Sequence, residues 1–468
     1  MISVDRPGSP GWWFNHLHDR LTASRDHYQL LDDHYTGEAA APVMASTQIR
    51  QAYQRLMSMA RTNFAELVVE AVRERMTPVA FRTGVDGDEN GDAEALRIWQ
   101  ANALDADSAL VHRASLSMGM GYVIVGPVDD ETGAPVITVE DPREVVAVMD
   151  PQRRRKVRAA LKMYVDPDTG VGNAYLYLPG QVYRAQAKPG VMDRQLVSFE
   201  PDGWDWVGEG QRLPINAVPV VPFPNRANSY GRSFGEFETH IAVLARINYQ
   251  ILQRLEIATL QAFRQRAIKG VPNVDEDGEP VDYSNVFESS PGSFWLLPPE
   301  AELWESGVVD LNPIRQAIRD DVQDLAAVTR TPLFYLSPEA ANGSAEGASL
   351  AREGLVFKTK DRIGQATESW EQVLSLAFQF AGDNQRASRQ DIEVLWLPPE
   401  RFSLAERYDA ASKASAAGVP WREIMSDVLQ FSPQAVERMQ SERAGDALLT
   451  AALNTPSVPR ALPVAGNA

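Results

Sequence analysis

An apolar seam between Phe237 and Ala262 constrains the fold of this chain more than any other feature of its sequence. Its positions are alternately four and three residues apart, which is the spacing of a heptad-like helix. The seam consists of Phe237, Ile241, Leu244, Asn248, Ile251, Leu255, Ala258 and Ala262. Apolar stripes on helices usually pack in a core, but the helical period here extends from Phe234 to about Arg266. A helix of roughly 30 residues is about 45 Å long, so the pattern predicts an elongated assembly.

A second helix is predicted to begin at Asn312-Pro313, where Asn caps the helix and Pro takes its first position. Its apolar face consists of Ile314, Ala317, Ile318, Val322 and Leu325. The segment between the two helices is irregular and acidic, and strands are predicted at Arg266–Lys269 and Phe294–Leu297. Helix, small β insertion and helix therefore form one unit, an arm with a small tip.

The rest of the chain combines helices with a β-rich region, which predicts an α+β fold. The first segment, from about Pro10 to Phe81, has mainly helical periodicity. Further helices are expected at Ala93–Asn102, Asp107–Met118, Leu350–Phe380, Leu404–Gly418, Pro420–Leu429 and Pro433–Leu449. Strands are expected at Tyr122–Val125, Val136–Val139, Val145–Val148, Val157–Val165, Ala174–Leu178 and Asp391–Leu397. The small residues of Pro338–Gly347 predict a flexible loop.

Composition excludes several classes of function. The 468 residues include 45 Lys and Arg against 63 Asp and Glu, a net charge of −18, which disfavours tight sequence-specific DNA binding. There is no cysteine, so disulfides, thiolate metal sites and a Cys nucleophile are impossible. No stretch of the sequence is apolar enough for a transmembrane helix, and the first residues do not form a secretory signal. We therefore expect no membrane association.

The sequence Gly231-Arg232-Ser233-Phe234-Gly235 matches the G-x-S-x-G pattern of a nucleophile elbow. A serine there needs a base, and the one histidine downstream, His240, lies on the helix expected to start at the serine itself. The favoured interpretation is a tight turn in which Ser233 caps the long helix. A serine hydrolase with Ser233 as nucleophile stays an alternative.

No cofactor or metal site is predicted. Asp86-x-Asp88-x-Asn90 resembles the start of a calcium loop, but the twelfth position is Arg97 and a cation there would repel calcium. His16 and His18 point to different faces of a helix, and no zinc-binding pattern or phosphate-binding loop occurs. The basic run Gln152–Arg158 could contact phosphate, but in a chain this acidic a solvated turn, or a pairing with an acidic neighbouring subunit, is favoured.

A series of short motifs runs along the chain: Tyr28–Gly37, Leu96–Asp105, Gly119–Val125, Tyr230–Ser233, Thr329–Leu336, Asn342–Gly347, Leu395–Pro399, Asp409–Lys413 and Gly418–Pro420. In their order and spacing they resemble the portal (head–tail connector) proteins of tailed bacteriophages, especially those of actinobacteriophages. The resemblance extends over about residues 25–450.

The resemblance implies a phage portal fold with a mixed α/β wing, a long-helix stem, a small β-containing clip and a helical C-terminal crown. The wing would be residues 1–233 and 349–398, the stem 234–265 and 309–330, and the clip 266–308. Residues 331–348 would form a tunnel loop, and 399–468 the crown and tail. No enzymatic activity is implied.

The family's function implies a ring, usually of twelve copies, at one capsid vertex, through which double-stranded DNA is packaged and ejected without sequence recognition. Implied partners are the terminase large subunit, head-completion or adaptor proteins, the major capsid protein and a scaffolding protein. Such a protein is located in the virion, and in the host cytoplasm during assembly. A different virion structural or adaptor protein is the alternative.

Three groups of site residues follow from the resemblance. The DNA-facing tunnel loop would contain Ala340, Ala341, Asn342, Gly343, Ser344, Ala345 and Glu346. The docking surface of the clip would contain Asp275, Glu276, Asp277 and Glu279. The stem interface between neighbouring subunits would contain Phe237, Ile241, Leu244, Ile251, Leu255, Ile314, Ile318 and Leu325.

Overall fold

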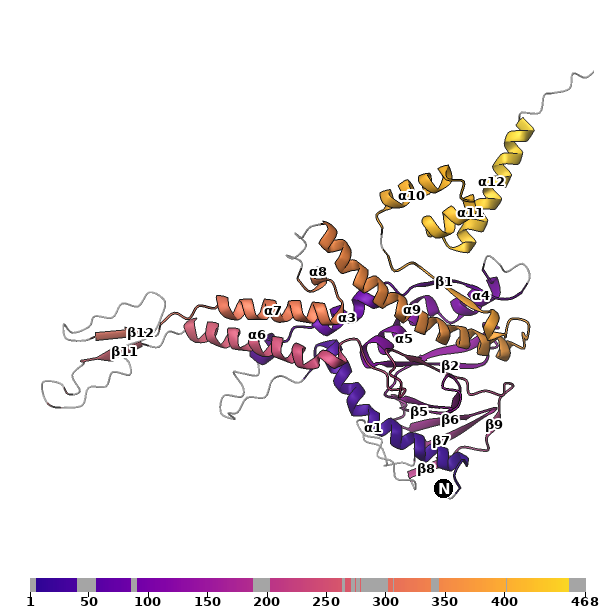
Figure 1. Ribbon diagram of the computed structural model, residues 1–468. Coiled ribbons are helices and arrows are strands. Elements are labelled where there is room, and N and C mark those ends of the chain that lie inside the picture. The colour runs from indigo at the N-terminus through magenta and orange to yellow at the C-terminus, as the bar shows by residue number, and fades with distance from the viewer. Residues whose placement is uncertain are drawn as a thin grey trace, which may run out of the picture. The chain divides into compact units, whose positions relative to one another are not determined.

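A computed structural model describes residues 6–39, 56–85, 91–187, 203–262, 266–270, 274, 278, 302–305, 307–337, 345–400 and 402–453. The chain forms two compact units, and Figure 1 labels their helices and strands. The large unit comprises Met1–Ala39, Asn63–His240 and Ala326–Ala468, and the small unit comprises Ala40–Thr62 and Ile241–Leu325. The small unit is thus built from two segments that interrupt the sequence of the large one.

Helix α1 (Pro10–Thr36) packs against a sheet in the large unit. The Ser9 hydroxyl accepts a hydrogen bond from the Trp12 amide, and the helix ends at Gly37, whose φ of 79° favours glycine. The sheet has the order β4-β5-β6-β7-β8, and β9 also pairs with β7. These strands are β4 (Val145–Met149), β5 (Val157–Val165), β6 (Gly172–Leu178), β7 (Gln181–Ala187), β8 (Trp204–Trp206) and β9 (Gln211–Arg212). Phe14 and Leu17 are fully buried against this sheet.

A second sheet of the large unit, in the order β10-β2-β3, is covered by helices α5 and α9. Its strands are β2 (Met120–Val128), β3 (Pro135–Glu140) and β10 (Val220–Pro224), and the helices are α5 (Leu104–Met118) and α9 (Ala345–Ala381). The interior is aromatic. Trp370 of α9 is fully buried, donates a hydrogen bond from Nε1 to Nε2 of His112, and packs edge-on against Phe223. Burial therefore lowers the pKa of His112 to about 3, which keeps this core imidazole neutral.

Helix α3 (Phe64–Arg73) is followed by β1 (Pro78–Arg82), which pairs antiparallel with β13 (Glu393–Trp396). The sequence analysis placed residues up to Phe81 in a helical segment, and that prediction is wrong for β1. The helical period does end before Pro78, and the apolar residues after it complete a two-stranded sheet with the far end of the chain.

The small unit contains α6 (Ile241–Ala262), α7 (Asn312–Thr329), whose last four residues belong to the large unit, and the antiparallel pair β11 (Arg266–Lys269) and β12 (Glu302–Glu305). Arg246 of α6 and Asp321 of α7 form a two-pronged ion pair, with N···O distances of 2.9 and 2.6 Å. The order helix, β pair, helix is confirmed. The predicted strand Phe294–Leu297 lies outside the described residues, and β12 was not foreseen.

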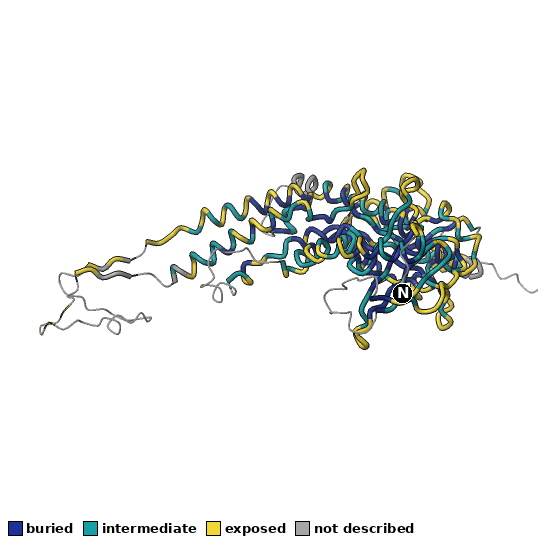
Figure 2. The backbone as a smooth tube through the Cα atoms, turned by 90° about the horizontal axis from the view of Figure 1, so that it is seen from below, coloured by how far each residue is buried: buried dark blue, intermediate teal, exposed yellow. Residues whose placement is uncertain are grey.

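The long helix begins later than its apolar pattern predicted. A short 3₁₀ turn, η2 (Glu238–His240), precedes α6, and residues 232–237 are not helical. Buried polar bonds hold these residues in the large unit, so Phe234 and Phe237 are not part of the helix. Figure 2 shows that α6 and α7 carry mainly intermediate and exposed residues, whereas fully buried backbone gathers in the large unit.

Of the remaining helices, α8 and η4 were not predicted, and the others agree with the prediction except at their ends. They are α4 (Ala93–Ala101), α8 (Leu333–Leu336), η4 (Arg389–Asp391), α10 (Leu404–Ala416), α11 (Trp421–Glu423), the π-helical turn η5 (Ile424–Val428) and α12 (Pro433–Leu453). Helix α10 starts at a capping box in which Ser403 and Glu406 satisfy each other's backbone amides. Helix α9 starts at Ala345 and α8 forms one turn, so those parts of the loop predicted over 331–348 are helical, and residues 338–344 lie outside the described residues.

Candidate functional site

The predicted tunnel loop and clip surface lie largely beyond the described part of the chain. Ala340, Ala341, Asn342, Gly343 and Ser344 lie outside the described residues, as do Asp275, Glu276, Asp277 and Glu279. Ala345 and Glu346 belong to the first turn of α9 rather than to a loop. The assignment of these residues to DNA contact and docking therefore stays a prediction.

The predicted stem-interface residues fall into two groups. Phe237, Leu244 and Leu325 are fully or almost fully buried within this chain. Phe237 lies beside the ring of His34, with centroids 6.4 Å apart, so it packs in the large unit and not along a helix seam. The half-buried members are Ile241, Ile251, Leu255, Ile314 and Ile318. Because only these five still have area to bury, the interface prediction is now restricted to them.

Ser233 neither caps a helix nor contacts a base. It lies five residues before η2, so the helix cap that we predicted is wrong. Its hydroxyl oxygen is buried and has no hydrogen-bond partner in the described part of the chain. Burial, followed by the positive charges of Arg226 and Lys358, lowers the pKa of His240. A nucleophile elbow needs a serine hydrogen-bonded to its base, and that arrangement is missing here.

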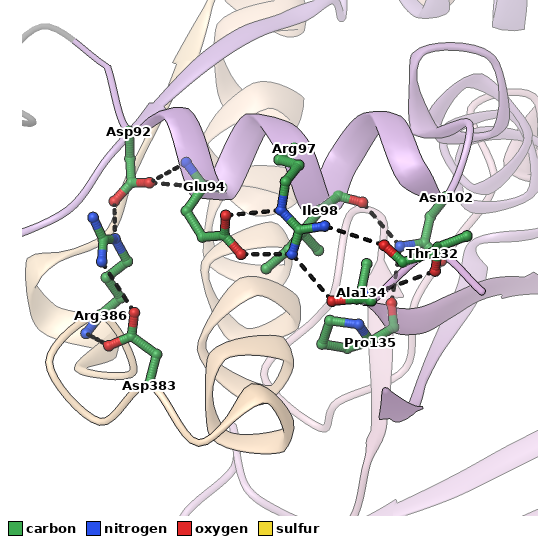
Figure 3. A network of polar contacts seen from close by, with 12 residues as sticks. Asp92, Glu94, Arg97, Ile98, Asn102, Thr132, Ala134, Pro135, Asp383 and Arg386 are labelled. Carbon is green, nitrogen blue, oxygen red and sulfur yellow. Dashed lines mark hydrogen bonds and ion pairs between the residues drawn. The ribbon is translucent and has the colours of Figure 1, made fainter. Parts of the chain in front are cut away.

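No grouping of three or more His, Asp or Glu side chains suited to a metal ion occurs among the described residues. Arg97, which occupies the last position of the calcium-like pattern, forms ion pairs with Glu94 and donates to the carbonyls of Thr132 and Gly133 (Figure 3). It therefore ties α4 to the turn between β2 and β3. The basic run leading into β5 is an exposed turn, as we predicted.

The most unusual constellation of the described residues is a buried ion cluster around Glu236. Its carboxylate is 2% exposed and lies 2.6 Å from Nε of Arg362 and 3.3 Å from Nζ of Lys358, both on α9. Nδ2 of Asn225 donates to the same carboxylate at 3.0 Å. One buried anion is therefore shared by two cations and an amide, which is the condition under which a buried charge is tolerated.

Lys358 also reaches the end of α7. Its ammonium, 4% exposed, donates to the backbone carbonyl of Thr329 at 2.8 Å. Glu236 comes just before the segment that leads into α6, and Thr329 is the last residue of α7. The cluster, which we call the junction cluster (Asn225, Glu236, Thr329, Lys358 and Arg362), thus fixes to α9 both places where the chain leaves and re-enters the large unit.

The junction cluster favours the charged form of Glu236 but disfavours the charged form of Lys358. Burial by itself would raise the pKa of Glu236, but the charges of Lys358 and Arg362 outweigh burial and lower it to about 2. Burial lowers the pKa of Lys358, and Glu236 offsets only part of that effect because Arg362 claims the same carboxylate and also repels the ammonium. Glu236 is therefore the member whose charge stabilises the cluster.

The backbone around Glu236 is held as tightly as its side chain. The Glu236 amide donates to the Leu116 carbonyl at 2.7 Å, and Nδ2 of Asn225 donates to the Phe234 carbonyl at 3.0 Å. Gly235 approaches α5 so closely that a Cβ atom there would lie 2.1 Å from the carbonyl oxygen of Ser117. The segment between β10 and η2 is thus a rigid anchor.

A second buried acid supports the far end of α9. Asp92 caps α4 through the amides of Glu94 and Ala95, and it accepts hydrogen bonds from Thr83 at 2.6 Å and from Nε of Arg386 at 2.7 Å (Figure 3). Burial raises the pKa of Asp92, but these hydrogen bonds more than offset burial and the pKa is lowered. Buried carboxylates therefore hold α9 at Lys358 and Arg362, and hold the chain just beyond the end of α9 at Arg386.

The junction cluster was missed from the sequence, although one signal was present. Leu355, Ala366 and Trp370 form the buried stripe of α9, and Lys358 and Arg362 lie on that same stripe. Two cations on an apolar helix face require a buried anion, but the sequence does not say which of many acids supplies it. Glu236 is 126 residues away from Arg362.

Within the described residues, no helix combines the length and apolar character that crossing a bilayer would require. Sequence comparison relates the chain to known proteins. The family model described as "Phage portal protein, SPP1 Gp6-like" matches residues 15–447. The portal protein of Mycobacterium phage D29 is 26% identical over 375 residues, which are 77% of this chain and 73% of that protein. The portal protein of Mycobacterium phage L5 is 26% identical over 424 residues, 87% of this chain and 83% of that protein.

Proposed function

Because the chain belongs to the SPP1 Gp6-like family of phage portal proteins, we propose that it forms a ring at one capsid vertex through which double-stranded DNA enters and leaves. The family is structural and not enzymatic, and its members are components of the phage virion. We take twelve copies as the expected number. The observation that carries this proposal is the family match, which spans residues 15–447 and so includes both units.

The charge of the chain supports a passive channel. Each phosphate contact adds salt-dependent affinity, and a channel through which DNA slides should therefore offer few of them. Each copy carries a net charge of −18, so a ring of copies favours repulsion between its walls and DNA. Of the residues 331–348 that we assign to the tunnel loop, those from 340 to 348 would supply mostly small side chains at the narrowest point.

Ring closure requires head-to-tail contacts between identical copies. We assign part of this interface to the half-buried apolar residues of α6 and α7. They are Ile241, Ile251, Leu255, Ile314 and Ile318. A rigid start and end for these helices is useful in such a ring, because every copy must present the same surfaces to both neighbours. The junction cluster supplies that rigidity.

We assign the wing, stem, clip and crown to the ranges expected from the sequence. The acidic segment at 275–279 would be the surface on which the terminase large subunit and later the head-completion proteins dock. Contacts with the major capsid protein and a scaffolding protein would involve the remaining outer surface. These assignments rest on the family and on the order of elements in the small unit.

The ring is tested by size-exclusion chromatography with light scattering and by negative-stain electron microscopy of the purified full chain. We expect particles near twelve times the 51.7 kDa chain mass, with a central hole in end-on views. Particles that stay at the mass of one chain in every buffer, without annular views, would contradict the proposal. A small oligomer without a hole would instead favour an adaptor or other structural role.

The clip assignment is tested separately by charge reversal of Asp275, Glu276 and Asp277 to Lys. We expect the ring to form normally while DNA packaging in an assembly reaction falls at least tenfold. A matched control reverses three exposed acids of the large unit, which are Asp130, Glu131 and Asp168. Equal packaging by the clip variant and the unmodified protein would remove the docking role, whereas an equal loss in both variants would point to net charge alone.

A further inference from the structure

The turn between β4 and β5 is a basic loop whose conformation is fixed by hydrogen bonds within the turn. Oδ1 of Asp150 accepts hydrogen bonds from the amides of Gln152 and Arg153, at 2.8 and 3.2 Å. The Lys156 amide donates to the Arg153 carbonyl at 2.7 Å, and the Asp150 amide donates to the Lys156 carbonyl at 2.7 Å. The turn therefore has a defined conformation, although all its side chains from Gln152 to Lys156 are exposed.

Four exposed cations follow one another in this turn, and the nearest negative charge is Asp150, whose carboxylate interacts with the charge of Lys156. In the described part of the chain, none of Arg153, Arg154, Arg155 and Lys156 forms an ion pair with an acidic side chain. Several arginines elsewhere in the large unit do form such pairs, as Arg143 does with Asp32 and Asp141. In a chain with 18 more acids than bases, this basic run thus faces a single acid of its own turn, Asp150, and forms no ion pair among the described residues.

A neighbouring loop adds an exposed aromatic ring to the cations. Nη1 of Arg154 donates to the carbonyl of Ser229 at 2.7 Å, which brings the turn against residues 228–232. The next residue, Tyr230, is 95% exposed, the largest exposed fraction among the large apolar and aromatic side chains described. Oδ1 of Asn228 accepts the amide of Tyr230 and fixes that loop. Cations and an exposed tyrosine therefore lie together on one surface.

We propose that this basic turn, Arg153–Lys156 with Tyr230 beside it, binds the phosphate backbone of duplex DNA without reading its sequence. Guanidinium groups match phosphate oxygens in a two-pronged geometry, and an exposed tyrosine hydroxyl is a further donor to phosphate. Duplex DNA carries one negative charge for every 1.7 Å or so of its axis, so three or four closely spaced cations can each meet a phosphate.

This inference rests on the proposed function, which brings DNA and this protein together. A phosphate-binding surface would impede DNA that must slide through the channel. We therefore assign the basic turn to DNA that is not in transit, which it would hold in place. DNA is favoured over an acidic protein surface because the turn is fully exposed and presents three arginines in succession. The experiment below distinguishes DNA from the other candidate partner, an acidic patch on a neighbouring copy.

The experiment measures binding of a fluorescent random-sequence duplex of about 20 base pairs to the purified full-length ring, by anisotropy over a range of salt concentrations. We expect log K to fall with log salt with a slope of about −3, as for three or four phosphate contacts. Changing Arg153, Arg154, Arg155 and Lys156 to Gln should weaken binding at low salt at least tenfold and bring the slope close to zero. Tyr230→Ala should weaken it severalfold.

Two control variants separate the site from net charge and from folding. The first removes four exposed arginines elsewhere, changing Arg20, Arg61, Arg315 and Arg438 to Gln. The second changes the three arginines of the turn to Lys, which keeps the charge. We expect both to retain binding within about threefold, since the attraction is to local positive charge.

The possible outcomes are distinct. Unmodified rings that do not bind the duplex, or equal losses in the turn variant and the scattered-charge control, would overturn the inference while leaving the ring, and with it the proposed function, intact. A turn variant that no longer forms rings in light scattering would show that the turn pairs with an acidic neighbouring copy, which also overturns it. Loss of duplex binding confined to the turn variant, with the ring preserved, supports it.

Discussion

Replacing Glu236 by Gln tests whether the junction cluster is held together by one anion. The change keeps the size and a hydrogen-bonding oxygen, but it leaves the buried ammonium of Lys358 and the guanidinium of Arg362 without a compensating charge. Removing one partner of a buried ion pair costs about 3 to 5 kcal/mol. With an unfolding entropy of about 2.1 cal/mol/K per residue, a large unit of roughly 360 residues loses about 1.3 °C of Tm per kcal/mol. We therefore expect Tm to fall by about 4 to 7 °C.

Because the cluster favours the charge of Glu236 and disfavours that of Lys358, we expect Lys358→Met to lower Tm less than Glu236→Gln does. Lys358→Met removes a cation that burial disfavours and leaves Glu236 paired with Arg362 and Asn225. It costs mainly the hydrogen bond to Thr329, about 1 to 2 kcal/mol, or about 1 to 3 °C. The double variant with both changes should lose less than the sum of the two, because a single buried cation then remains unpaired.

The assay is thermal unfolding followed by circular dichroism, with all variants compared in the same oligomeric state because association shifts Tm. Glu368→Gln is the matched control. It makes the same chemical change on α9, but at a carboxylate that is 48% exposed and pairs with Arg389 at the surface, so its effect should stay within about 0.5 kcal/mol. The reasoning would be refuted if Lys358→Met lowered Tm as much as Glu236→Gln, or if the two changes were additive.

Two further predictions concern the same region. The pKa of Glu236 is lowered to about 2 in the folded chain from an ordinary value of 4.5. The stability that its charge contributes is therefore complete above pH 4.5 and is lost as the pH falls toward 2. In acid titrations, Tm should consequently fall less steeply over this pH range in the Glu236→Gln variant than in the unmodified protein. Gly235→Ala places a methyl group 2.1 Å from the Ser117 carbonyl oxygen and should lower Tm by several degrees. Gly364→Ala, in an open position on α9, is the control and should leave Tm unchanged or raise it. Equal Tm values for the two alanine variants would contradict the close approach at Gly235.

Much of the secondary structure could be predicted because it is local. The strands from β2 to β6 are short runs of mainly apolar and β-branched residues between turn residues, and helices such as α4, which Asp92 caps, carry apolar stripes. These signals depend on a few neighbouring residues, so they survive without knowledge of the fold. The order of two helices around a β pair in the small unit was predictable for the same reason.

What could not be predicted depends on partners far apart in the sequence. Periodicity extended the long helix back to Phe234, because an apolar residue at Phe237 fits a heptad equally well whether it continues a helix or fills a core. The choice was made by two hydrogen bonds that the local pattern does not contain: Asn225 donates to the Phe234 carbonyl, and the Glu236 amide donates to the Leu116 carbonyl. Ser233 was assigned as a cap by the same misplaced helix start.

The pairing of β1 with β13 has a consequence for synthesis of the protein on the ribosome. Arg82 and Glu393, which face each other across this sheet, are separated by 311 positions. Translation must pass Trp396 before the sheet can close, and every residue of α6, β11, β12 and α7 has emerged by then. Nascent or prematurely terminated chains that have not passed Trp396 therefore lack a finished large unit.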